Sequence, residues 1–165
     1  MRHHRLYATA ALASLLAVPT VLADAGQTRR QGPQKSPVEI SLKIGGSSYS
    51  SNEPGTCAHA PTASIYGVLS EMWSVRQETE GRSAQLTMWR SKKDGEETFS
   101  LSVNDKKNVS VSTVRGGQVT GSGTIKLQPS GKGGTFTIDA KTKAGETVTG
   151  TIVCPAFTPA TAEGG

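Results

Sequence analysis

Residues 38–44 read Val-Glu-Ile-Ser-Leu-Lys-Ile, in which apolar and polar side chains alternate with a period of two. Successive side chains of a β-strand point to opposite faces, so this stretch predicts a strand with one buried and one solvated face. Gly45 and Gly46 end the run. The number of times that this alternation recurs along the chain therefore indicates the fold class.

Strand-like runs recur along the chain, with turn residues between them. Asp94 and Gly95 form a strong hairpin signal between two of these runs. No helical period competes after the first 23 residues. We predict an all-β domain, an antiparallel sandwich or barrel of about eight short strands, and the sequence does not decide between the two. Besides 38–44, the runs lie near 72–76, 86–90, 99–103, 109–113, 119–127, 136–140 and 147–154.

The first residues have the pattern of a secretory signal. Arg2 and Arg5 precede an uncharged, mostly apolar run over 6–18, and small residues then allow cleavage after Ala23 or Ala25. The apolar run is too short to span a membrane stably, and no acylation cysteine follows it. We expect a signal peptide over 1–23, export to the periplasm or outside a bacterial cell, and no stable membrane insertion.

The remainder divides into a leader, one domain and a tail. Residues 24–37 are polar and contain two prolines, which predicts a flexible leader. The β-domain is expected over 38–157, and 158–165 are expected to form a loose tail. Within the domain, 47–64 are rich in Ser, Pro, Gly and Ala. This stretch is predicted to be irregular, either a strap held by a disulfide or a functional loop.

Cys57 and Cys154 are the two cysteines of the chain. An even number of cysteines in an exported protein predicts a disulfide between them. The alternation over 147–154 places Cys154 on the same face as Val148 and Ile152, which is the predicted inner face.

Composition and motifs exclude several functions. The formal net charge is +5, of which Arg2 and Arg5 supply two, and no basic cluster with interleaved aromatic residues predicts a nucleic-acid partner. His59 is the one histidine after residue 23, whereas zinc sites need three or four ligands. His59 is therefore interpreted as an isolated surface residue, and neither metal nor cofactor is predicted. No nucleophile elbow, phosphate loop or dinucleotide fingerprint is present. We predict no catalytic residues.

Aromatic residues supply the remaining candidates for a binding surface. Trp73 lies on the apolar side of its predicted strand, which favours core packing, whereas the side taken by Trp89 depends on whether its strand is regular. An exposed tryptophan on a β-sheet is a common platform for ligands. The candidate binding surface is Tyr49, His59, Tyr66 and Trp89.

Three features together resemble a known family. The first strand ends in Ile44-Gly45-Gly46, a cysteine follows about a dozen residues later, and the last strand closes on a cysteine over 149–154. This frame is similar to that of the mycobacterial surface lipoprotein antigens of the LpqH kind. Those proteins are lipid-anchored, whereas this chain lacks the acylation cysteine. The resemblance implies an envelope-associated β-domain without known catalysis, and it transfers no site residues.

Three functions remain open at this stage. The first is a non-enzymatic module that binds a ligand, an envelope component or another protein. The second is a structural or inhibitory envelope protein that makes its contact through 47–64. The third is a small secreted hydrolase whose site the sequence does not reveal. The identity of a ligand or protein partner and the oligomeric state are not determined by the sequence.

Overall fold

The structure, a computed structural model, describes residues 35–161, which form twelve strands and no helix. The predicted signal peptide, leader residues 24–34 and residues 162–165 lie outside this range. Within the described range no helix is available to cross a membrane. The prediction of an all-β fold is confirmed.

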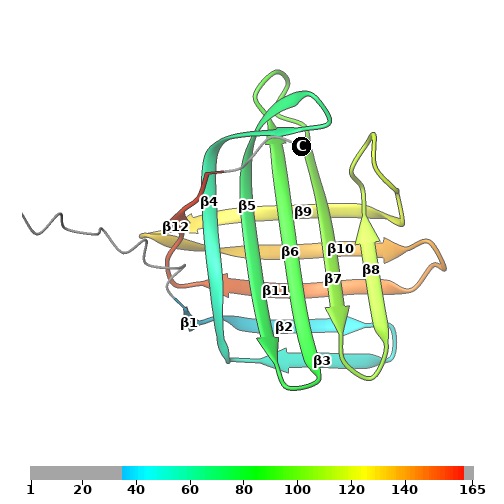
Figure 1. The fold of residues 1–165 in the computed structure, drawn as a ribbon. Coiled ribbons are helices and arrows are strands. Elements are labelled where there is room, and N and C mark those ends of the chain that lie inside the picture. Colours follow the sequence, from blue (N-terminus) through cyan, green and yellow to red (C-terminus); the bar gives the residue numbers. More distant parts are fainter. Residues whose placement is uncertain (1–34, 162–165) are drawn as a thin grey trace, which may run out of the picture. The chain divides into compact units, whose positions relative to one another are not determined.

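The strands form two sheets (Figure 1). Neighbouring strands are antiparallel, except that β12 runs parallel to β4. Sheet A contains, in spatial order, β1 (Ser36–Pro37), β4 (Pro54–Ile65), β5 (Val68–Thr79), β6 (Arg82–Ser91), β7 (Glu97–Asn104) and β8 (Asn108–Ser112), with β12 (Thr158–Pro159) also on β4. Sheet B contains β3 (Ser47–Ser51), β2 (Glu39–Ile44), β11 (Thr147–Cys154), β10 (Gly133–Thr142) and β9 (Gly121–Ser130).

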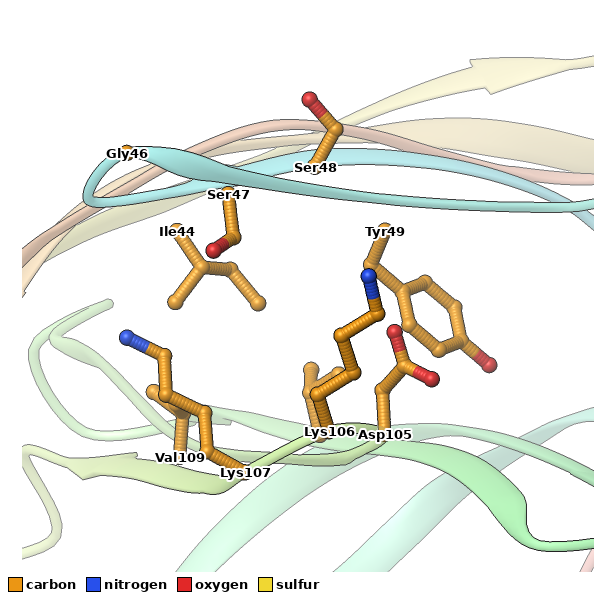
Figure 2. A pocket seen from close by; sticks show the side chains of 10 residues that line it. Ile44, Gly46, Ser47, Ser48, Tyr49, Asp105, Lys106, Lys107 and Val109 are labelled. Carbon is orange, nitrogen blue, oxygen red and sulfur yellow. The ribbon is translucent and has the colours of Figure 1, made fainter.

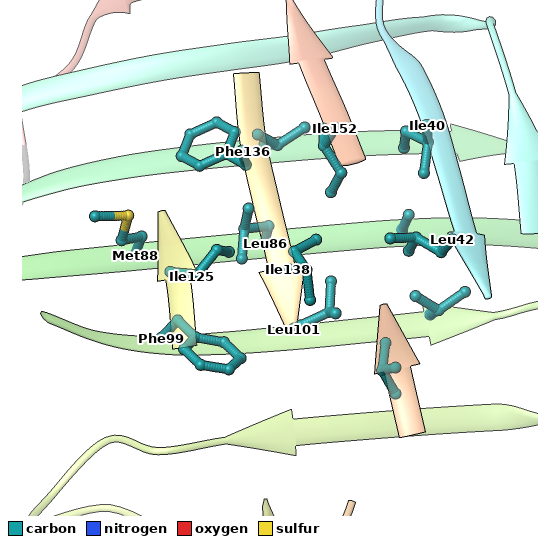
Figure 3. Close-up of a cluster of buried hydrophobic side chains, with 14 of the residues drawn as sticks. Ile40, Leu42, Leu86, Met88, Phe99, Leu101, Ile125, Phe136, Ile138 and Ile152 are labelled. Carbon is teal, nitrogen blue, oxygen red and sulfur yellow. The ribbon is translucent and has the colours of Figure 1, made fainter. Parts of the chain in front are cut away.

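The two sheets pack face to face as a sandwich, and their strands cross steeply in Figure 1. Each inner face contributes the alternate, apolar side chains of its strands to one core, as the period-two pattern requires. The sheets do not close into a barrel, which resolves the alternative left by the sequence. Figure 3 shows the centre of the core, formed by Ile40, Leu42, Leu86, Met88, Phe99, Leu101, Ile125, Phe136, Ile138 and Ile152.

A disulfide joins the two sheets. Cys57 of β4 is bonded to Cys154 at the end of β11, with their Cα atoms 6.0 Å apart. Both residues are buried, and Cys154 lies on the inner face together with Val148 and Ile152. The predicted pairing and the predicted face of Cys154 are both confirmed.

The prediction that 47–64 are irregular is wrong. Most of this stretch forms β3 and β4, with a bulge between Ala60 and Ala63 that accommodates Pro61. The buried side of β4 includes the small residues Gly55, Cys57 and Ala60, and a Cβ atom on Gly55 would lie 2.8 Å from the carbonyl oxygen of Arg76. Small side chains hide the apolar alternation on which a prediction from sequence depends.

The strand count also differs from the prediction of about eight, since the described range contains twelve strands. Two of the additional strands, β3 and β4, lie in the stretch expected to be irregular. Two others, β1 and β12, contain two residues each and flank β4. Strand pairing therefore begins two residues before the predicted start of the domain at position 38 and ends two residues after its predicted end at position 157.

Candidate binding groove

Trp89 lies on the outer face of sheet A. β6 is regular, with Ala84, Leu86 and Met88 buried on the inner face, so the alternation turns the Trp89 side chain away from the core. Trp73 pairs with Met88 and is buried, as its predicted side requires. The uncertainty over Trp89 is thus resolved by the absence of a bulge in β6.

Two adjoining cavities meet at Trp89, and together they are called the Trp89 groove here. Both are lined by Ile65, Trp89 and Val114. One, of about 270 Å³, extends towards the β6–β7 turn and reaches Lys93 and Asp94. The other, of about 390 Å³, extends across β7 and β8. The groove therefore has a tryptophan at its centre, with aliphatic side chains from the end of β4 and from the loop after β8 at its sides.

Tyr66 closes one side of the groove. It is at the tip of the β4–β5 hairpin with φ of 45°, a left-handed conformation that residues other than glycine adopt infrequently. Its ring lies against Gly116 and Gly117, because a Cβ atom on Gly117 would come within 2.8 Å of the Tyr66 hydroxyl oxygen. The glycine pair thus allows the hairpin tip to meet the 114–118 loop.

The rim of the groove is apolar where the hairpin tip is exposed. Tyr66, Val68 and Leu69 are 62%, 45% and 54% exposed, and they are three of the four large hydrophobic residues of the described range that are exposed to this degree. Scattered exposed hydrophobic residues are ordinary, but a contiguous group beside a cavity marks a contact surface. The rim and the tryptophan therefore belong to one surface.

Polar groups complete the groove. Hydroxyl groups of Ser64, Ser100 and Ser112 line the part that crosses β7 and β8. The opposite end is charged, where Arg115 Nη2 lies 3.0 Å from Glu96 Oε1.

The charged end also has a carboxylate held in its ionised form. The backbone N–H of Glu96 donates a hydrogen bond of 3.0 Å to Asp94 Oδ1. This bond, with a further contribution from Ser91, lowers the pKa of Asp94. The groove thus offers an apolar centre, a hydroxyl-lined side and an end with charges of both signs.

His59 is partly exposed and lies away from the Trp89 groove, and the interpretation that it is isolated is wrong. Its ring stacks on Trp73 with centroids 4.8 Å apart, and its Nε2 lies 2.9 Å from Glu71 Oε1. Arg90 joins this cluster through Glu71, whose Oε2 lies 3.9 Å from Arg90 Nη1, and its Nε donates a 2.9 Å hydrogen bond to Glu97. The partners of His59 lie on the next strand, so they follow only from the strand register.

Sequence reasoning missed Glu71, Arg90 and Glu97. A signal for part of this cluster was present, because a hairpin at Asp94 and Gly95 places Arg90 directly opposite Glu97. The cluster has the composition of a structural ion-pair network. Within residues 35–161 no hydroxyl group hydrogen-bonds to His59, and no three metal-ligating side chains come together.

Tyr49 is buried on β3 of sheet B and lines neither cavity of the Trp89 groove. It is 2% exposed, and the guanidinium of Arg82 lies 4.5 Å from the centre of its ring. Its ring forms part of the wall of a separate cavity (Figure 2). Of the four predicted binding residues, the structure thus brings together Tyr66 and Trp89 and separates Tyr49 and His59 from them.

Comparisons of this chain with protein-family models, with curated proteins and with solved structures found no match. The function of the groove therefore has to be inferred from its own geometry.

Proposed function

We propose that this chain is an exported, non-enzymatic binding module that holds its ligand in the Trp89 groove. The observation that carries the proposal is the meeting of two cavities at one outward-facing tryptophan, beside the exposed hairpin tip. Binding sites are typically concave and mostly apolar, with a few polar groups that orient the ligand. The groove has this composition.

The groove favours a ligand with a flat apolar face and a polar edge. The indole of Trp89 offers a flat contact area, and Ile65 and Val114 line the same space. The serine hydroxyls can each donate and accept a hydrogen bond at the ligand's edge. We assign the envelope of the producing cell as the source of this ligand.

Two features support an exported location. The pattern over 1–23 is that of a signal peptide. The inter-sheet disulfide is of the kind that persists in oxidising compartments such as the periplasm. The resemblance to the LpqH-type antigens agrees with an envelope location, although the chain itself lacks their acylation cysteine.

Native mass spectrometry of the protein purified from the envelope of its own host tests the proposal. We expect a defined adduct on the wild-type protein and its loss from the Trp89→Ala variant. Gln85→Ala is the matched control, since Gln85 lies on the same face of the same strand but does not line the groove. The control variant should keep the adduct.

Stability measurements separate binding from folding. Because Trp89 is only partly buried, its replacement should cost less than the roughly 3–5 kcal/mol typical of a buried aromatic residue. An adduct that survives Trp89→Ala would overturn the assignment of the groove. A wild-type protein that never carries an adduct would instead favour a structural or protein-binding role in the envelope.

A further inference from the structure

A further cavity, separate from the Trp89 groove, lies between the β2–β3 hairpin and the β7–β8 turn (Figure 2). Its volume is about 270 Å³. One wall belongs to sheet B and the other to sheet A, so a bound molecule would contact both layers of the sandwich. We call this space the hairpin cavity.

The floor of the hairpin cavity is apolar. Ile44, Val103 and Val109 line it, and each of them is a buried member of the core. A ligand that enters the cavity would therefore cover hydrophobic surface at the boundary of the core, which favours binding of an apolar group.

The charges at the cavity leave one cation without a partner. The carboxylate of Asp105 lies 3.1 Å from Arg82 Nε, and the ammonium group of Lys107 pairs with Glu146. Lys106 forms no ion pair with any residue of the described range. Figure 2 shows its side chain extending across the cavity towards β3. The cavity therefore offers one uncompensated positive charge to a ligand.

Hydroxyl groups lie on the wall opposite Lys106. The hydroxyl of Ser47 points into the cavity, whereas that of Ser48 points away, as alternation along β3 requires (Figure 2). The phenol of Tyr49 forms part of the same wall. The phenol is a hydrogen-bond donor at neutral pH, and burial raises the pKa of Tyr49 further above that range.

We propose that the hairpin cavity binds a small monocarboxylic acid with a short apolar body, whose carboxylate accepts hydrogen bonds from Lys106 and Ser47 while its apolar body covers Ile44, Val103 and Val109. This site is independent of the Trp89 groove. The single uncompensated charge matches a monoanion, whereas phosphate recognition typically recruits an arginine fork or several cations. The volume falls just below the roughly 300–1,000 Å³ of cavities for drug-sized ligands, so a small acid fits.

A titration with 4-methylpentanoate, followed by the backbone amide resonances of the purified protein, tests the proposal. We expect saturable shifts centred on Ser47, Tyr49 and Lys106, with a Kd on the order of 1 mM for so few ligand atoms. The neutral 4-methylpentanamide should bind about tenfold more weakly, because it lacks the charge-assisted hydrogen bond. Comparison with an N-acetyl dipeptide ending in leucine distinguishes a free acid from the carboxyl terminus of another protein.

Variants make the titration decisive. Lys106→Gln keeps most of the side chain but removes the charge, and we expect it to weaken binding of the acid about tenfold, with Lys106→Arg restoring most of the affinity. Lys126→Gln on β9 is the charge-matched control and should bind as the wild type does. Equal affinity for the acid and the amide, or unchanged affinity in Lys106→Gln, would overturn the proposal. Trp89→Ala should leave the titration unchanged, so failure of this site and failure of the Trp89 groove are distinguishable.

Discussion

Removal of the inter-sheet disulfide should reduce the stability of this fold more than any single surface change. Cys57 and Cys154 are each 2% exposed, so a reductant has little access to the bond in the folded protein. The perturbation of choice is therefore the double variant in which both cysteines are replaced by alanine. Alanine fits the buried positions without introducing an unsatisfied polar group.

The expected magnitude follows from the length of chain that the bond closes. The two cysteines are 97 positions apart, for which the loop-entropy relation gives about 4.7 kcal/mol of stabilisation. Removal of native disulfides from small domains costs roughly 2–5 kcal/mol in practice. Since single domains have a total stability of about 5–15 kcal/mol, the variant should remain folded at 25 °C with a much smaller margin.

Urea denaturation followed by far-UV circular dichroism measures the effect. With a slope of about 1–2 kcal/mol per molar urea for a domain of this size, a loss of about 3–4 kcal/mol lowers the midpoint by roughly 2 M. Wild-type protein unfolded and refolded in reductant is the control and should match the double variant. An unchanged midpoint in the double variant would refute the reasoning, because it would show that the bond does not restrict the unfolded chain.

Three further predictions concern the core, the backbone and pH. Phe136→Ala should lower the free energy of unfolding by about 3–5 kcal/mol in the same urea assay, because the side chain is fully buried, and a loss below about 1 kcal/mol would contradict its place in the core. Gly150→Ala should cost more than about 1 kcal/mol, because φ is 141° and the new Cβ would lie 2.0 Å from the carbonyl oxygen of Ser41; a variant as stable as the wild type would show that β2 and β11 are not so close. Burial raises the pKa of Tyr49 above its ordinary value of 10.0, so the stability that the neutral phenol contributes is fully present below pH 10 and is lost as the pH rises through the folded-state pKa. Tyr49→Phe should therefore lose less stability than the wild type between pH 9 and 11. Parallel curves of unfolding free energy against pH for the two proteins would contradict the direction of the pKa shift.

The sequence predicts the parts of the fold whose signals are local. The alternation from Val38 to Ile44 predicts β2, and Asp94 with Gly95 predicts the β6–β7 hairpin. The two cysteines predict their own pairing because no alternative partner exists. Each of these signals lies within a few neighbouring residues or, for the disulfide, follows from the number of cysteines.

The remaining features depend on partners distant in the sequence. β4 is not predicted because its buried residues are mostly small, Gly55 and Cys57 among them, and their burial is decided by the neighbouring strands. Trp89 and Tyr66 could be selected as aromatic candidates, but their groove needs the 114–118 loop to meet the β4–β5 hairpin. Tyr49 and His59 were chosen by residue type alone, which gives no information on which layer of a sandwich a side chain joins.

The arrangement of sheet B has a consequence for the timing of folding. β2 follows directly after the first strand of the described chain, yet one of its two neighbours is β11, so Ile44 pairs with a residue more than 100 positions later, Val148. Ribosomes need roughly 5–20 s to make a segment of that length, and pairings between such distant segments form slowly in any case. The β2–β3 hairpin of sheet B therefore stays unpaired along the β2 edge until nearly the whole chain has been made.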